Sequence, residues 1–304
     1  MLNRLEGVKA LAYVSIMCSL CTLFVIAGMY IPFSTIAILL IIPLCTTFVV
    51  LKVDYKYTLI YSLSSTFISF IDPLNALFVV IPCIISGIVL GILLKKYIQG
   101  YLVIFYTSLT LILLQFFAQF LILWIFEKDV PSIYDHLLGF HEKIFDYIYL
   151  LFLFLISLAQ ATLSYIIISN ELSKLSYIFN ERKNIFIPIL ITTTLLLIFT
   201  IILRWFSFPL SYLFLGFTFY FGIILGVYNF SYYRKKEIMF LQIPLYAISI
   251  ISFFVLSPYF EANTTIYLTL IIVISEILVS FYIIFYQKII RKGQIDESLF
   301  DKLK

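Results

Sequence analysis

Hydrophobic residues run through most of this chain in long stretches that short polar segments separate. The stretches are about 18 to 24 residues long, and they lack the alternation of apolar and polar residues that marks a barrel strand. Because backbone polar groups in lipid need internal partners, such stretches predict transmembrane helices. We expect ten, at residues 9–30, 34–51, 57–71, 74–94, 101–126, 146–169, 185–203, 209–232, 238–256 and 264–286. The third is short, and a re-entrant pair over 57–94 would reduce the count to eight.

The composition agrees with this pattern. Of 304 residues, 63% are hydrophobic and 12% are charged, and the mean hydropathy is +1.11. Soluble domains are about half apolar and about a quarter charged, so lipid must cover much of this excess. The sequence therefore predicts an all-α, polytopic integral membrane helical bundle. The first stretch is full length and lacks a small-residue cleavage site, so we expect a retained span rather than a signal peptide.

The basic residues predict an orientation. With the N-terminus inside, Lys128, Lys143 and Arg204 fall outside, and the other 17 of the 20 basic residues fall inside. Three basic and seven acidic residues give the outer face a charge of −4, and 17 basic and eight acidic residues give the inner face +9. An excess of Lys and Arg in cytoplasmic loops is the rule for membrane proteins. We therefore expect a cell-membrane protein with both termini in the cytoplasm. Basic inner loops attract anionic membrane lipid, so they do not indicate a nucleic-acid partner.

Two longer polar segments organise the chain. The outer segment 127–145 has apolar spacing that suggests a short helix lying at the membrane interface. The cytoplasmic segment 170–184 is the best candidate boundary between two parts. We expect a six-helix membrane part over 1–170 and a four-helix membrane part with a short cytoplasmic tail over 171–304.

Polar side chains within the predicted spans are the main candidates for function, because burying them in lipid is costly. At about 1.5 Å per residue, Gln115, Gln160 and Glu276 lie roughly 16, 21 and 18 Å below the outer ends of their spans. Gln119 lies one turn above Gln115 on the same face. These groups would line a polar cavity, in which Glu276 binds a cationic or hydroxyl-bearing substrate or relays a proton. The structural alternative is hydrogen bonding between helices, with Glu276 protonated and packed.

Other polar candidates favour structural roles. Arg204, at the outer end of the seventh span, would bind an anionic headgroup or substrate, or would simply extend to the interface. Cys18 and Cys21 form a C-x-x-C pattern inside a span with no second pair, which favours small apolar packing over a redox or metal site. The outer segment carries residue types that bind zinc, at a spacing that does not place two ligands on one helix face: Asp135, His136, His141 and Glu142. We expect no metal site and no cofactor.

Nucleotide-binding and hydrolytic motifs do not occur in the sequence. It contains no Walker A sequence, no G-x-S-x-G, no HExxH and no dinucleotide fingerprint. We expect no enzymatic activity, and any coupling to ATP would come from a separate subunit.

Three segments of the first part resemble a known family. They are KALAYVSIMCSL, YIPFSTIAILLIIPL and DPLNALFVVIPCIISGIVLGILLKK, which carry Pro32, Asp72-Pro73, and Gly87 and Gly91 before a lysine pair. These segments resemble the substrate-binding S components of energy-coupling factor transporters. Over its whole length the chain more closely resembles the YybS-like family of bacterial membrane proteins, which are similar to S components.

This resemblance implies that a small molecule enters from outside, between the fourth to sixth helices and the outer segment, and that separate ATPase and coupling subunits are partners. Two features depart from the pattern. The alanine-x-x-x-alanine surface of the first helix is missing, with only Ser15 and Ser19 at a similar spacing, and the four C-terminal helices have no counterpart. Two other functions stay open: a scaffold for envelope or cell-shape assembly, and a membrane enzyme that acts on lipid-linked substrate.

Overall fold

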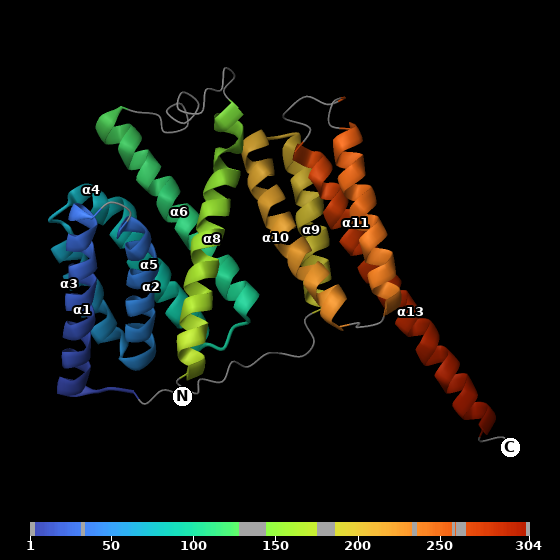
Figure 1. Ribbon diagram of the computed structural model, residues 1–304, viewed down its shortest axis with the longest axis horizontal. Coiled ribbons are helices and arrows are strands. Elements are labelled where there is room, and N and C mark those ends of the chain that lie inside the picture. The colour runs from blue at the N-terminus through green and yellow to red at the C-terminus, as the bar shows by residue number, and fades with distance from the viewer. Residues whose placement is uncertain are drawn as a thin grey trace. The chain divides into compact units, whose positions relative to one another are not determined.

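The computed structural model describes residues 4–31, 34–127, 144–174, 186–232, 236–256, 259 and 266–301 (Figure 1). Within these ranges the chain is helical and contains no strand. The helices are α1 (Gly7–Tyr30), α2 (Ser34–Lys52), α3 (Tyr55–Ser69), α4 (Pro73–Asn75), a π-helical turn η1 (Ala76–Val80), α5 (Ile81–Lys95), α6 (Gly100–Phe126), α8 (Ile144–Lys174), α9 (Phe186–Arg204), α10 (Phe208–Tyr232), α11 (Lys236–Leu256), a 3₁₀ turn η3 (Ile266–Thr269) and α13 (Leu270–Asp301).

Seven segments of the described chain are long and apolar enough to cross a membrane. They are Gly7–Gly28, Ala76–Lys95, Gly100–Ile125, Ile148–Lys174, Phe186–Arg204, Phe208–Phe230 and Ile266–Phe285. Two shorter apolar helical segments, Ala37–Lys52 and Ile243–Leu256, accompany them. The prediction of an all-helical, multi-pass membrane protein is therefore confirmed, whereas the count of ten stays a prediction.

The third predicted span differs most from a membrane-crossing helix. The helix α3 has 15 residues and spans about 22 Å, which is less than the roughly 30 Å of a hydrocarbon core. Its buried residues are Thr58, Tyr61, Ser65 and Ser69, so the face that packs inward carries hydroxyl groups. This helix packs against α1 and, less extensively, against α2.

The chain divides into two compact units. The first contains Met1–Phe145 and Phe152–Arg182, and the second contains Asp146–Leu151 and Lys183–Lys304. The helix α8 therefore contributes residues 146–151 to the second unit and its other residues to the first. The division into a six-helix part and a four-helix part stays a prediction.

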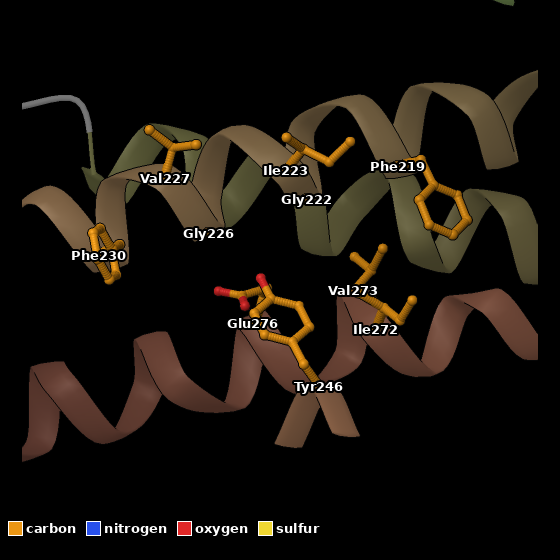
Figure 2. Close-up of a pocket in the computed structure, with 10 residues that line it drawn as sticks. All are labelled: Phe219, Gly222, Ile223, Gly226, Val227, Phe230, Tyr246, Ile272, Val273 and Glu276. Atoms are coloured by element: carbon orange, nitrogen blue, oxygen red, sulfur yellow. The ribbon is translucent and has the colours of Figure 1, made fainter. Parts of the chain in front are cut away.

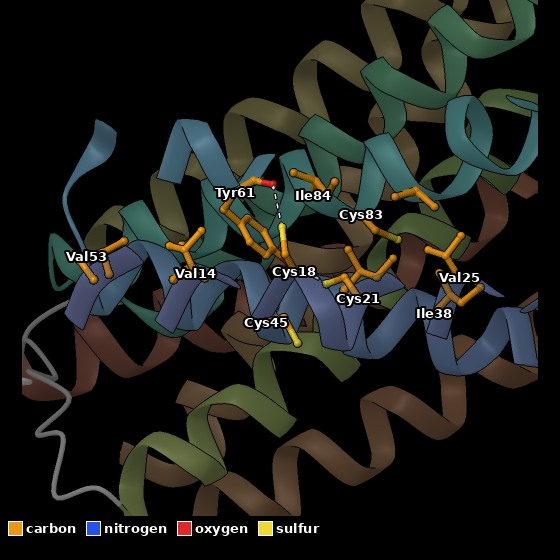
Figure 3. Close-up of a cluster of buried hydrophobic side chains, with 14 residues drawn as sticks. Val14, Cys18, Cys21, Val25, Ile38, Cys45, Val53, Tyr61, Cys83 and Ile84 are labelled. Atoms are coloured by element: carbon orange, nitrogen blue, oxygen red, sulfur yellow. Dashed lines mark hydrogen bonds between the residues drawn. The ribbon is translucent and has the colours of Figure 1, made fainter. Parts of the chain in front are cut away.

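Buried side chains of α1, α2, α3 and α5 form the main core of the first unit (Figure 3). Gly87 and Gly91 let α5 approach α2 closely, because a Cβ atom at Gly87 would lie 2.7 Å from the Cβ of Thr46 and one at Gly91 would lie 2.7 Å from the Cβ of Val50. A G-x-x-x-G pattern permits such a close contact between helices, because its small residues share one helix face.

The four cysteines are buried in this same core, as expected for small apolar side chains. Hydroxyl groups of α3 contact two of the thiols. The Sγ of Cys21 lies 2.8 Å from the hydroxyl of Tyr61, and the Sγ of Cys18 lies 3.2 Å from the Oγ of Ser65. Among the described residues no group of three or more His, Cys, Asp or Glu side chains is arranged to hold a metal ion.

One end of the first unit gathers several of the basic residues that the charge pattern assigned to the inner face. Arg4 forms a salt bridge with Asp54, and the backbone N–H of Leu5 donates to the carbonyl of Lys52. At the same end, the Nζ of Lys95 lies 3.5 Å from the carbonyl oxygen of Val50. Residues 4 and 5, the 52–54 connection and the end of α5 therefore lie on one side of the first unit.

The second unit is a bundle of α9, α10, α11 and α13, and it also includes residues 146–151 of α8. The helix α10 packs against both α9 and α13, and α11 packs mainly against α13. One of its core clusters contains Tyr212, Leu215 and Leu270, which are all buried. After residue 286, where the last predicted span ends, α13 continues as a helix to Asp301.

Candidate functional site

Glu276 is the centre of the polar group that holds α10 against α13. It lies midway along the apolar segment Ile266–Phe285 and is 2% exposed. The Nδ2 of Asn229, a fully buried side chain on α10, donates to the Oε2 of Glu276 at 2.8 Å and to its backbone oxygen at 3.3 Å. One turn after Glu276, the hydroxyl of Ser280 donates to the Oδ1 of Asn229 at 3.1 Å and to the backbone oxygen of Glu276 at 2.8 Å. The carboxyl group is therefore fixed in position by a neighbouring helix.

Two glycines on α10 allow this approach. Gly222 and Gly226 are four residues apart, so they share one face of the helix, and Asn229 follows three residues later on that face. A Cβ atom at Gly222 would lie 3.0 Å from Val273, and one at Gly226 would lie 3.2 Å from the Cδ of Glu276. Larger side chains there would separate the helices and take the amide of Asn229 out of reach of the carboxylate.

A cavity of about 530 Å³ lies beside this group, within the second unit. Ten residues line it: Phe219, Gly222, Ile223, Gly226, Val227, Phe230, Tyr246, Ile272, Val273 and Glu276. Figure 2 shows the lining residues on α10, α11 and α13, with Tyr246 of α11 beside the carboxyl group of Glu276. The volume falls within the roughly 300 to 1,000 Å³ of small-molecule sites. Such a site is typically apolar with a few polar groups that orient the ligand, and here Glu276 and Tyr246 are the polar lining side chains.

The cavity opens at the surface of the second unit along one edge of α10. Three of its lining residues, Ile223, Val227 and Phe230, are 64%, 60% and 57% exposed, and their spacing places them along one edge of α10. The helices α10 and α11 each pack closely on α13 but contact each other only slightly. The carboxyl group therefore lies on the floor of a cavity whose rim is apolar.

The predicted glutamines lie in the first unit. The Oε1 of Gln115 accepts a hydrogen bond from the hydroxyl of Ser157 at 3.1 Å, and the Nε2 of Gln160 donates to the Sγ of Cys83 at 3.5 Å. These contacts join α6, α8 and α5, which is the interhelical bonding that the structural interpretation predicts. The Oε1 of Gln119 is buried and has no hydrogen-bond partner within the described part of the chain. That these glutamines share one cavity with Glu276 stays a prediction.

Arg204 makes an aromatic contact at the end of α9. Its Cζ lies 4.8 Å from the ring centroid of Tyr267, and that ring stacks on Tyr212 with centroids 5.4 Å apart. The hydroxyl of Tyr267 donates to the Oγ of Ser211 at 2.7 Å. Tyr267 precedes Glu276 by nine residues, or roughly 14 Å along the helix, so Arg204 belongs to a different part of the second unit from the Glu276 cavity.

Several site residues were missed from the sequence. Asn229, Tyr246 and Ser280 were not singled out, although an asparagine inside an apolar segment is as uncommon as a glutamine. The pattern Gly222-x-x-x-Gly226-x-x-Asn229 was the signal that could have found the partner of Glu276, because it places two small residues and one amide on a single helix face. The predicted interface helix and the zinc-type residues Asp135, His136, His141 and Glu142 lie outside the described residues.

Comparison with known proteins leaves the fold and the site to be interpreted on their own geometry. No family model matches the chain, and no curated protein or solved structure is significantly similar to it.

Proposed function

We propose that this protein binds or transports a small molecule in the membrane, and that the Glu276 cavity is its binding site. The observation that carries the proposal is a cavity of about 530 Å³ with a buried carboxyl group fixed at its floor by Asn229. An ionisable side chain in a membrane segment is costly, and it usually faces a protein interior or a cavity where it has a function. A purely structural contact between α10 and α13 would not require an adjoining cavity of ligand size.

The finer features of the proposal rest on the sequence. We propose ten spans with both termini in the cytoplasm, which the strong excess of basic residues in the predicted inner loops supports. We also propose that the chain is S-component-like and related to the YybS-like proteins, which the quoted segments of the first 96 residues support. Separate ATPase and coupling subunits would then bind the first unit. Ser15 and Ser19 lie on an exposed face of α1, where such a subunit would have access to them.

Mass spectrometry of the purified protein tests the binding function. We expect the wild-type chain, extracted with its native lipid, to retain a small molecule that is lost from a variant with a blocked cavity. Val227→Trp places an indole at the exposed rim without disturbing a buried contact, and Gly226→Leu fills the interior beside Glu276. Ala247→Leu is the matched control, because it adds a similar side chain to an exposed position of α11 next to the cavity-lining Tyr246.

The same measurement can contradict the proposal. If the wild type and both blocked variants retain the same molecules, or the wild type retains none, the cavity is not a binding site. Co-purification of envelope proteins without any retained small molecule would favour the scaffold function instead. Correct folding of each variant is checked by its melting temperature and by gel filtration.

A further inference from the structure

The chemistry of the cavity narrows the class of ligand. Its lining combines one carboxyl group with Phe219, Phe230, Tyr246 and aliphatic side chains. We propose that the ligand is a lipophilic cation, such as an amine or quaternary ammonium group attached to an apolar body, and that it enters sideways from the lipid. This inference rests on the proposed function, since it names the ligand of the same cavity.

The carboxyl group of Glu276 determines which charge the ligand can carry. Glu276 lines the cavity, and the amide of Asn229 donates to its Oε2 at 2.8 Å. None of the ten residues that line the cavity is basic, so the charge of a bound ligand would face this carboxyl group and no opposing side-chain charge. A ligand cation therefore gains attraction at this point, and in surroundings of low polarity that attraction is stronger than it would be in water. An anionic ligand of the same shape is repelled.

The aromatic side chains fit a cation with little hydration. The ring faces of Phe and Tyr attract ammonium and related cations, and the attraction grows when water is excluded. A small hydrated ion such as Na⁺ would need several oxygen ligands, whereas the oxygens of this lining come from Glu276 and the hydroxyl of Tyr246. A bulky organic cation binds little water and needs few oxygen ligands, and its apolar groups fill the space that the aliphatic side chains enclose.

The position of the rim predicts the route of entry. The rim residues Ile223, Val227 and Phe230 are all more than half exposed and all apolar. They belong to the segment Phe208–Phe230, which is long and apolar enough to cross the membrane. The opening along this edge of α10 therefore lies at the depth of hydrocarbon rather than of water. A ligand that first dissolves in the bilayer reaches Glu276 through this opening without crossing a polar surface.

Three probes test the proposal on the full-length protein in lipid nanodiscs, with empty nanodiscs as the reference for partition into lipid. Tetraphenylphosphonium and tetraphenylborate have nearly the same shape and opposite charges, and N-phenyl-1-naphthylamine is neutral. Binding is measured by equilibrium dialysis for the ions and by fluorescence for the neutral probe. We compare the wild type, Glu276→Gln, Val227→Trp, and Glu171→Gln, a matched control at an exposed carboxyl group of the first unit.

The expected result is saturable binding of tetraphenylphosphonium to the wild type, with tetraphenylborate excluded. Glu276→Gln keeps the shape of the side chain and should weaken binding of the cation by about 30-fold while leaving the neutral probe unchanged. Val227→Trp should weaken the cation and the neutral probe together, and Glu171→Gln should change neither. If Glu276→Gln fails to fold, the preference of the wild type for the cation over the anion still tests the selection by charge.

The failures of the two proposals can be told apart. If the neutral probe binds in a manner sensitive to Val227→Trp, but the wild type does not distinguish the cation from the anion or Glu276→Gln binds the cation normally, the cationic ligand class is wrong and the binding site stands. If none of the three probes binds above the level of empty nanodiscs, or if Val227→Trp changes none of them, the cavity does not bind small molecules and both proposals fall.

Discussion

Replacing Asn229 with leucine tests whether the contact between α10 and α13 depends on the hydrogen bonds to Glu276. The side chain of Asn229 is fully buried, and it donates to Glu276 at 2.8 Å and 3.3 Å. Leucine has a similar size, so the change removes the donors while leaving little empty space. Glu276 is 2% exposed, so water has little access to the oxygen atoms that lose this donor.

Two estimates bound the effect of this change. A hydrogen bond within a protein contributes a net of about 0.5 to 1.5 kcal/mol, and more where one partner is charged. Interhelical hydrogen bonds measured in a membrane protein average about 0.6 and reach about 1.7 kcal/mol. Because Asn229 makes two bonds to Glu276 and is also bonded by Ser280, we expect the free energy of unfolding to fall by about 2 kcal/mol.

A double-mutant cycle separates the pairwise interaction from the effects of each substitution. Asn229→Leu, Glu276→Leu and the double variant are compared by unfolding in mixed micelles. The double variant should be more stable than the sum of the single losses predicts by about 1 to 2 kcal/mol, because each single variant breaks the bond between the two side chains while keeping one of its polar partners. Asn170→Leu, at an exposed position of α8, is the matched control and should change stability by less than about 0.5 kcal/mol.

The outcome that would refute this reasoning is specific. If Asn229→Leu costs less than about 0.5 kcal/mol, or if the two single losses simply add, then Asn229 does not stabilise the carboxyl group of Glu276. The fixed floor of the cavity, on which the binding proposal depends, would then have no energetic support.

Two further predictions concern the first unit and the orientation. Gly87→Ala would place a methyl group 2.7 Å from the Cβ of Thr46 and 2.8 Å from the carbonyl oxygen of Pro43. We therefore expect the free energy of unfolding to fall by about 1 to 3 kcal/mol, with a lower melting temperature. An unchanged melting temperature would show that α5 and α2 can separate freely. In intact cells a membrane-impermeant maleimide should label Glu127→Cys, and it should label Lys96→Cys only after permeabilisation. Background labelling should be low because the native cysteines are buried. The reverse pattern would mean that the predicted orientation is inverted.

The apolar stretches were sufficient to predict the helical membrane fold, and they were least informative for the third and fourth spans. The third is a helix of 15 residues with buried hydroxyl groups, so its inward face resembled a polar surface in the sequence. The fourth is divided into α4, η1 and α5. At its start the side chain of Asp72 accepts from the N–H of Asn75 at 3.2 Å, and Pro73 follows as the first helical residue. These two residues are a helix-start signal that the sequence does contain.

For the candidate site, the sequence predicted the unusual residue but not its partners. Glu276 stood out because a carboxyl group in an apolar stretch is costly wherever the helix packs. The sequence also suggested that Glu276, Gln115 and Gln160 lie at similar depths. Depth along a span does not say which helix is the neighbour, and within their own units the glutamines bond to Ser157 and Cys83 whereas Glu276 bonds to Asn229.

The amino-acid sequence by itself determined that this protein is a multi-pass helical membrane protein with one carboxyl group deep in an apolar segment, because both follow from the local free energy of placing side chains and backbone in lipid. Only the tertiary structure decided that Gly222, Gly226 and Asn229 meet that carboxyl group and that a cavity adjoins it. Those features depend on which helices pack together and at what rotation, and packing in lipid is set by close contacts between surfaces that are all similarly apolar.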